Sequence, residues 1–391
     1  MKPIYLDYNG TTPHDPEVVA AMRPFLEEEF GNPSSGHLYA LKPRQALDTA
    51  RRQVAGLLNC DPEEVIFTSG GTEANNWAIL GTAHALRGRG RHIVTSRIEH
   101  PAVLNVCAFL EKDGYAVTYL PVDSQGMVDI ADVASALRPD TVLISIMHAN
   151  NEVGTIQPMT EIAALARTRG IRVHTDAAQS AGKIPVDVVA MGVDLLSLAG
   201  HKLYAPKGVG ALCIRKGVIL ETFMHGAGQE MGRRAGTENI LEIVGLGKAC
   251  EIAARNLEDN CRHMLAMRDR LQAGITAAVA DVRLNGHPEK RLPNTLSLSF
   301  RNVEANRLLE AIGPEVAASA GAACHAGSVA VSHVLKAMAV PVEWAMGTLR
   351  LTTGRMTTAE EVDRAVQVIG QAVNTLKDGN IKTRKGMRSF L

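Results

Sequence analysis

A turn rich in small residues, Ser69–Asn76, is the first segment of this 391-residue chain that could do chemistry. Its sequence, SGGTEANN, stands between the apolar run VIFT and a segment of helical period. The free backbone N–H groups at the start of a helix, the helix dipole and the Thr72 hydroxyl could together hold a phosphate group. Serine and threonine are also common helix N-caps, so the turn by itself does not establish a phosphate site.

Three further polar residues each follow another apolar run. Asp176, after IRVHT, could cap a helix or pair with the protonated ring nitrogen of a cofactor. Lys202, after DLLSLA, could be a surface lysine or, with its pKa lowered by burial, the amine that forms a Schiff base with an aldehyde. His100, after HIVTS, could cap a helix or lie over a planar ring. Each of them has an ordinary structural explanation when it is taken alone.

Together, the four features meet the binding needs of one cofactor. A phosphate turn, an acid for a ring nitrogen, an amine for an aldehyde and an imidazole for a planar ring are the groups that bind pyridoxal 5′-phosphate. Ligands of doubly wound sheets sit at the carboxyl ends of the strands, and each feature follows a different expected strand. The sequence therefore predicts a pyridoxal-phosphate site at one edge of a sheet.

The elements that must position these residues follow an α/β pattern. Between about residues 60 and 215, segments of helical period alternate with the apolar runs VIFT, HIVTS, AVTYL, TVLISIM, IRVHT, DLLSLA and VGALCI. This alternation predicts a mainly parallel, doubly wound sheet of seven strands. A long helix is expected from about residue 240 to 280, and the runs that follow it indicate a second, smaller α/β domain.

Composition and charge narrow the class of protein. The chain has 41 Lys and Arg against 41 Asp and Glu, and this zero net charge argues against a protein that binds nucleic acid or anionic lipid. The start MKPIYLDYNG has no secretory apolar core and no stretch approaches the ~20 apolar residues of a membrane span, which favours a cytoplasmic protein. The six cysteines form neither a C-x-x-C pair nor a zinc-spaced set, so no metal is expected. The basic tail NIKTRKGMRSFL has no period and could be a solvated end or a docking segment.

At the level of motifs, the chain resembles the cysteine desulfurases of the fold-type-I pyridoxal-phosphate superfamily, in the class-V aminotransferase-like branch that also contains the selenocysteine lyases. The resemblance is carried by LDYNGTTP, FGNPSSGH, FTSGGTEANN, EHPAV, MHANNEVGT, HTDAAQS, AGHKLYAPKGVGAL, RRAGTENI, GAACHAGS and LRLTTGR, which span nearly the whole chain. It implies a large cofactor domain over residues 14–258 and a small domain built from residues 1–13 and 259–391.

The resemblance also implies roles for the residues of the cofactor site. Lys202 would form the Schiff base, His100 would stack on the pyridine ring, and Asp176 would pair with the ring nitrogen. Gln179 would hydrogen-bond the ring hydroxyl. The other cofactor-binding residues implied in this way are Gly71, Thr72, Ala199, His201 and, from the neighbouring subunit of a homodimer, Thr237.

Cys324, in the small-residue stretch AGAACHAGS, is the catalytic thiol by the same resemblance. Composition alone would make it an ordinary thiol, but a loop of small residues suits a nucleophile that must enter a pocket and then carry its product out. Asn151 and Arg350 match residues that hold the substrate, the arginine by forking onto a carboxylate. His325 stands where Thr or Ser is common, and GAACH also resembles the selenocysteine lyases.

The activity that the resemblance implies is conversion of L-cysteine to L-alanine. Lys202 would move the α-proton, His100 would act as acid or base, and Cys324 would take the sulfur as a persulfide for an acceptor or scaffold protein. Iron–sulfur cluster assembly is one pathway served by such enzymes. The alternatives are a selenocysteine lyase, an aminotransferase, and a sulfur carrier or regulator on a retained enzyme fold.

Overall fold

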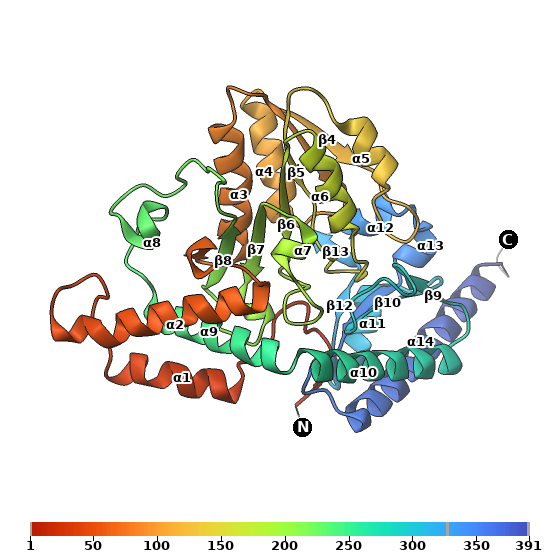
Figure 1. The fold of residues 1–391 in the computed structure, drawn as a ribbon. Helices are drawn as coiled ribbons and strands as arrows, with labels where there is room; N and C mark the ends of the chain where they lie inside the picture. The colour runs from red at the N-terminus through yellow and green to blue at the C-terminus, as the bar shows by residue number, and fades with distance from the viewer. Residues whose placement is uncertain (1, 326–327, 389–391) are drawn as a thin grey trace.

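The central sheet has seven strands, all of them where the sequence predicts strands. The computed structural model describes the backbone of residues 2–325 and 328–388 and, outside 322–330 and 380–388, their side chains. The strands are β2 (Val65–Thr68), β3 (His92–Ser96), β4 (Ala116–Leu120), β5 (Thr141–Ser145), β6 (Arg172–Asp176), β7 (Leu195–Ala199) and β8 (Gly210–Ile214). Their order is β2-β8-β7-β6-β5-β3-β4 (Figure 1). β8 alone runs in the direction opposite to the other six strands, which confirms the mainly parallel topology.

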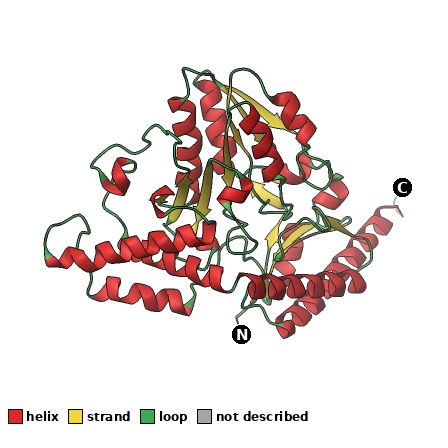
Figure 2. Ribbon diagram, viewed as in Figure 1, coloured by secondary structure: helices red, strands yellow, loops and turns green. Residues whose placement is uncertain are grey.

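The strands are continuous apolar runs because both faces of the sheet are covered. Every residue of β2, β3, β5, β7 and β8 is buried, whereas most of the edge strand β4 is half-buried. Continuous apolar runs are typical of parallel strands buried on both faces. The helices that connect the strands are α3 (Gly71–Ala85), α4 (Pro101–Lys112), α5 (Ile130–Ala136), α6 (Met159–Thr168) and α7 (Val188–Met191), and they flank the sheet (Figure 2).

The long helix expected from about residue 240 to 280 is two helices. Asn256, at φ −114° and ψ 16°, ends α9 (Ile240–Arg255), and α10 (Leu257–Ala278) begins directly after it. Asparagine is a poor residue for a helix interior because its side chain competes for backbone hydrogen bonds. Before the break, α9 packs against α1 (Pro16–Glu27) and α2 (Leu41–Leu58); after it, α10 packs against α14 (Ala359–Arg388) (Figure 1).

A second sheet follows α10 in the chain. It is antiparallel, with order β12-β15-β10-β9, and consists of β9 (Val282–Asn285), β10 (Thr295–Phe300), β12 (Ser319–Ala320) and β15 (Thr348–Thr352). Its core is separate from that of the first sheet and includes Leu6, because β1 (Ile4–Tyr5) pairs with β11 (Val316–Ala317). The remaining short elements are η1 (Leu38–Ala40), η2 (Pro62–Glu64), η3 (Gly200–Lys202), α8 (Gln229–Gly232), α11 (Ala305–Ile312), α12 (His333–Ala337) and α13 (Val342–Ala345). The domain boundaries at residues 14 and 258 stay a prediction.

Two segments expected to be irregular have regular backbones. The stretch around Cys324 forms a hairpin of β13 (Ala322–His325) and β14 (Ser328–Val331), in which Cys324 pairs with Val329. The basic tail, whose sequence has no period of its own, is helical as far as Arg388 because α14 extends through it. Its role as a solvated end or a docking segment stays a prediction. Among the described helices, none is long and apolar enough to cross a membrane.

Candidate active site

A pocket of about 300 Å³ lies at the carboxyl ends of the parallel strands. Of the residues predicted for the site, Cys324 lies outside the side chains that the structure describes, and all the others except Thr237 line the pocket. The predicted residues in its lining are Gly71, Thr72, His100, Asn151, Asp176, Gln179, Ala199, His201, Lys202 and Arg350. Residues separated by up to 279 positions in the sequence are thus brought to one cavity, as expected for the end of a doubly wound sheet.

Lys202 lies in η3, directly after β7, and its amine points at two backbone carbonyls. The Nζ atom donates to Asn9 O at 2.7 Å and to Gly10 O at 2.6 Å. Burial, assisted by the positive charge of Arg350, lowers the pKa of Lys202 from 10.5 to about 8. An amine with such a pKa has a much larger neutral fraction near neutral pH than an ordinary lysine, and the neutral form is the one that makes a Schiff base.

Asp176, the last residue of β6, is buried and rigidly held. Its Oδ2 accepts from Asn75 Nδ2 at 2.6 Å and its Oδ1 accepts from the backbone N–H of Ala178 at 2.9 Å. The Ala178 bond is the capping contact expected of a carboxylate after a strand. Since Asp176 also lines the pocket, the structural and the functional interpretations of this residue are both compatible with the geometry.

The start of α3 forms the wall of the pocket beside β7. Gly70 has φ +145° and ψ −178°, a conformation for glycine, and offers no side chain to cap the helix. A Cβ atom on Gly71 would lie 3.1 Å from Ala199 Cβ, so a larger residue would crowd this wall. The first N–H groups of α3 and the exposed Thr72 therefore face the pocket without a side-chain cap, an arrangement suited to an anion.

The two histidines of the pocket are both held by hydrogen bonds. His100 is the N-cap of α4, and its Nδ1 accepts from the backbone N–H of Ala102 at 3.1 Å. Desolvation in the pocket lowers the pKa of His100, with Asp176 opposing and Lys202 adding to this effect. Burial and the neighbouring Lys202 lower the pKa of His201 to about 4, so that ring is neutral at pH 7. His201 Nδ1 lies 3.1 Å from Thr11 Oγ1.

Arg350, from β15 of the second sheet, faces the pocket from the opposite side. Its NH2 pairs with Asp7 Oδ1 at 2.8 Å and its NH1 donates to the backbone oxygen of Asn151 at 3.3 Å. Its Nε is buried and has no hydrogen-bond partner among the described residues. A guanidinium with an unused donor beside the pocket is suited to a carboxylate ligand.

Thr237 lies outside this pocket, exposed on the loop between α8 and α9. The loop is tied to α3 because Arg234 forms a two-point ion pair with Glu73, with distances of 2.9 Å and 3.1 Å. The helix before the loop, α8, is also held in place, because the buried carboxylate of Glu230 accepts two hydrogen bonds of 2.8 Å from Arg51. Thr237 is therefore presented on the surface by a fixed loop.

The side chain of Cys324 lies outside the described side chains, but the base of its hairpin is well defined. Ser332 N donates to Gly321 O at 3.0 Å, and Ser332 Oγ donates to Glu152 Oε2 at 2.6 Å. His333 Nε2 lies 2.9 Å from the backbone oxygen of Glu99. The residues that follow the hairpin thus contact Glu152 and Glu99, which neighbour Asn151 and His100 of the pocket in the sequence.

Sequence reasoning missed the pocket residue Asn9, the nearby Asp7 and one buried lysine. Asn9 is 1% exposed and lines the pocket, and Asp7 pairs with Arg350. Lys183 lies seven positions after Asp176, and its amine bonds to both Asn9 and Gln179. The motif LDYNGTTP, a polar run with no helical or strand period, was the available signal for the first two. Nothing in the sequence distinguishes Lys183 from a surface lysine.

The donor set of the pocket fits pyridoxal phosphate. It offers an amine, a buried carboxylate, an uncapped helix start and an imidazole, which suit the aldehyde, ring nitrogen, phosphate and ring face of that molecule. Two buried polar atoms beside the cavity, Asn75 Oδ1 and Arg350 Nε, have no partner among the described residues. Such atoms are normally satisfied by water or a ligand.

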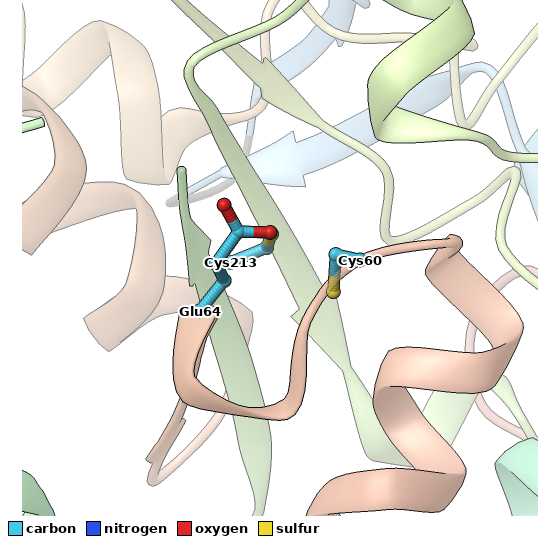
Figure 3. Close-up of side chains that lie close together, drawn as sticks. All are labelled: Cys60, Glu64 and Cys213. Carbon is cyan, nitrogen blue, oxygen red and sulfur yellow. The ribbon is translucent and has the colours of Figure 1, made fainter. Parts of the chain in front are cut away.

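Figure 3 shows a group of potential metal ligands, Cys60, Glu64 and Cys213. None of the three lines the pocket described above. The ligand atoms of the three are within 4.8 Å of one another. The carboxylate of Glu64 is already occupied, because it accepts from Arg215 Nε at 3.0 Å and from the backbone N–H groups of Lys216 and Asp61. We therefore assign no metal ion to this group.

The chain matches known proteins along nearly its whole length. The aminotransferase class-V family matches residues 4–365. A protein named cysteine desulfurase IscS from Methanosarcina thermophila is 48% identical, with 100% of this chain and 96% of that protein covered. Another of that name, from Vibrio vulnificus (strain CMCP6), is 46% identical, with 96% of this chain and 94% of that protein covered.

Solved structures agree with this match. One described as a NifS-like protein has a TM-score of 0.90 at 38% identity and covers 96% of this chain and 100% of its own. A second, described as SspA in complex with cysteine, has a TM-score of 0.80 at 36% identity and covers 90% of this chain and 99% of its own. The similarity of fold therefore extends over both sheets.

Proposed function

The chain belongs to the aminotransferase class-V family and, within it, to the cysteine desulfurases, and from this premise we propose how its residues divide the reaction. The protein is a pyridoxal-phosphate-dependent enzyme that converts L-cysteine to L-alanine and transfers the sulfur. The relatives are named for cysteine, so the selenocysteine lyase alternative is not favoured. One observation carries the assignment of residues: a lysine with a pKa of about 8 shares a pocket with Asp176 and Arg350.

Pyridoxal phosphate would be held at five points of the pocket. Lys202 would bind its aldehyde and Asp176 its ring nitrogen, while His100 would cover the ring face. Gln179 would bind the ring hydroxyl. The phosphate would lie against Gly71, Thr72, Ala199 and His201. When bound, the cofactor supplies an electron sink that stabilises negative charge at the α-carbon of the substrate.

Lys202 is the group that moves the α-proton of cysteine. Its Nζ has a pKa of about 8, close enough to neutral pH for the amine both to take a proton and to give it back. Its two carbonyl acceptors, Asn9 O and Gly10 O, orient the amine before the substrate enters. Arg350 and Asn151 hold the substrate, with the guanidinium bound to the substrate carboxylate.

Cys324 is the sulfur acceptor within the enzyme. As the thiolate, its Sγ attacks the sulfur of the substrate, and an S–S bond forms while the Cβ–S bond of the substrate breaks. The electron pair of the broken bond remains with the carbon skeleton, which takes up a proton and leaves as alanine. His100 is the acid or base for the thiol. A persulfide remains on Cys324 for delivery to an acceptor protein.

The assembly is a homodimer in which Thr237 of one subunit completes the phosphate site of the other. The support for this role is the exposed loop position of Thr237 and the two ion pairs that fix the loop. The enzyme acts in the cytoplasm and hands its sulfur to an acceptor or scaffold protein, as in iron–sulfur cluster assembly. No direct contact with nucleic acid or membrane is part of this proposal.

The test is alanine formation from cysteine, with a thiol reductant present and with pyridoxal phosphate loaded. Wild-type protein should release alanine, and Lys202→Ala should release none and should lose the Schiff-base absorbance. Lys207→Ala, which removes an exposed lysine five residues away, is the matched control and should behave as wild type. Alanine release by Lys202→Ala at the wild-type rate would remove Lys202 from its role.

A further inference from the structure

Lys183 is a buried lysine that the reaction described above does not use. It is 5% exposed, and its Nζ donates to Asn9 Oδ1 and to Gln179 Oε1, each at 2.9 Å. No carboxylate of the described residues forms an ion pair with it. Burying an amine without a counter-ion is costly, so the two amide oxygens are the contacts that define its role.

The hydrogen-bond count indicates that Lys183 is a neutral amine. A neutral amine has two N–H groups, which its two amide acceptors satisfy, whereas an ammonium group would have a third hydrogen without an acceptor among the described residues. Burial is the main reason that the pKa of Lys183 lies well below 10.5, and the positive charges of Lys202 and Arg350 act in the same direction. Lys183 therefore acts as a hydrogen-bond donor rather than as a charge.

Lys183 determines which end of the Gln179 amide faces the pocket. Because Lys183 Nζ donates to Oε1, the Nε2 group lies at the other end, where it donates one hydrogen to Asn9 O at 3.0 Å. The second Nε2 hydrogen has no partner among the described residues, and Gln179 lines the pocket. The reversed amide would place its oxygen against Asn9 O, so that bond would be lost, and it would leave one of the two hydrogens of the Lys183 amine without an acceptor among the described residues.

Asn9 links Lys183 to Lys202. The side-chain oxygen of Asn9 accepts from Lys183, and its backbone oxygen accepts from Lys202 Nζ at 2.7 Å. The Asn9 amide nitrogen donates to Thr295 Oγ1 at 2.9 Å and to Asn151 O at 3.1 Å. Asn9 is thus fixed on every side, and Lys183 supplies one of the bonds that fix it.

We propose that Lys183 is a positioning residue for the cofactor: it directs Gln179 Nε2 to the ring hydroxyl of pyridoxal phosphate and steadies the Asn9 carbonyl on which Lys202 Nζ rests. This inference rests on the proposed function, since it concerns the same site. Lys183 itself does not line the cavity that holds the reacting atoms. Its effect on the cofactor is therefore exerted through Gln179 and Asn9.

The first experiment compares the binding of pyridoxal phosphate to wild-type apoprotein and to Lys183→Met. Methionine has a similar length but no donor, so the Gln179 amide loses the bond that orients it. We expect the dissociation constant of pyridoxal phosphate to rise roughly 10-fold, the effect of one or two lost hydrogen bonds. We also expect a changed ratio of the visible absorbance bands, because the donor to the ring hydroxyl is misdirected.

Ser180→Ala is the matched control. Ser180 lies in the same turn, and its replacement removes a buried hydrogen bond between Ser180 Oγ and His148 Nδ1, which lie 2.9 Å apart. The Ser180 side chain does not bond to the Gln179 amide. Its absorbance bands should remain those of wild type. The same spectral change in Ser180→Ala would show a general loosening of the turn and would overturn the proposal.

A double-mutant cycle separates the route through Gln179 from any other. In a Gln179→Leu background, Lys183→Met should leave the absorbance bands unchanged, since no amide remains to be oriented. An equal spectral change in both backgrounds would overturn the proposal. If Lys183→Met does not fold, Gln179→Glu tests the same point. In this variant the side-chain carboxylate cannot donate a hydrogen bond to the ring hydroxyl, so the absorbance bands should change although Lys183 is still present. Unchanged bands would overturn the proposal.

The wild-type protein distinguishes failure of this inference from failure of the proposed function. Wild-type protein that does not bind pyridoxal phosphate or release alanine from cysteine would refute the proposed function. Wild-type protein that does both, together with a Lys183→Met variant of unchanged cofactor affinity and spectrum, would refute the positioning role of Lys183 alone.

Discussion

Asp7 Oδ1 lies 2.8 Å from Arg350 NH2, and both side chains are mostly buried. Ser319 Oγ donates to the same carboxylate oxygen at 2.9 Å, so the pair is part of a small network between the N-terminal segment and the second sheet. The guanidinium that we assign to the substrate carboxylate is therefore held in place before the substrate arrives. A preformed arginine reduces the ordering cost of binding.

Replacing Arg350 with lysine should weaken cysteine binding by about 10- to 100-fold, the effect of losing a charged hydrogen bond. Lysine keeps the charge but cannot donate from two nitrogens in one plane. The measurement is the KM of alanine formation together with cofactor affinity. Affinity for pyridoxal phosphate should stay near the wild-type value, and an unchanged KM would remove Arg350 from substrate binding.

Replacing Asp7 with asparagine should lower the pKa of Lys202. Asp7 favours the protonated form of that amine, while burial and Arg350 oppose it and bring the pKa to about 8. Uptake of pyridoxal phosphate by the apoprotein requires the neutral amine, so its rate rises with pH through this pKa. The rate profile of Asp7→Asn should therefore lie at lower pH than that of wild type. A profile at higher pH would contradict the electrostatic role given to Asp7.

Replacing Cys324 with serine should abolish alanine formation from cysteine while leaving cysteine binding, followed by the absorbance of the bound cofactor, intact. Cys261→Ser, at a half-buried cysteine of α10, is the control and should keep activity. Turnover of selenocysteine by the Cys324 variant checks the alternative chemistry, in which selenium leaves without a protein nucleophile. Cysteine turnover at the wild-type rate in Cys324→Ser would refute the persulfide mechanism.

Mixed dimers test whether Thr237 acts across the subunit interface. Lys202→Ala and Thr237→Glu should each be inactive as homodimers, the second because a carboxylate repels the cofactor phosphate. Co-expressed with different tags and purified as the mixed dimer, they should regain activity, since one site then has both Lys202 and the partner's threonine intact. If both homodimers are inactive, a mixed dimer without activity would place Thr237 in the site of its own subunit, and an active Thr237→Glu homodimer would place it in no site.

The fold could be predicted from the sequence largely because burial on both faces makes the strands continuous apolar runs. The break at Asn256 could not, since two helices of the same period read as one when a single residue departs from helical geometry. The helical tail was missed for a related reason: α14 continues through a basic stretch that has no apolar period of its own. Local patterns predict elements well and their exact ends poorly.

The candidate site was predicted wherever a polar residue follows a strand of the first sheet. Asp7 and Asn9 follow no such strand, and their position depends on contacts with residues more than 280 positions away, such as Thr295 and Arg350. Lys183 could not be identified because a lysine in a polar turn is normally solvated, whereas this one is buried and bonded to Asn9, 174 positions away in the sequence.

The position of Asn9 has a consequence for how the molecule is made. Its backbone N–H donates to Thr352 Oγ1 at 3.0 Å, and its side-chain amide donates to Thr295 Oγ1. During synthesis, residue 9 leaves the ribosome long before residue 352 is made. The N-terminal segment therefore lacks the residues it packs against for most of that time. The pocket can close only after nearly the whole chain has emerged, and such late, long-range closure makes this step slow compared with formation of the first sheet.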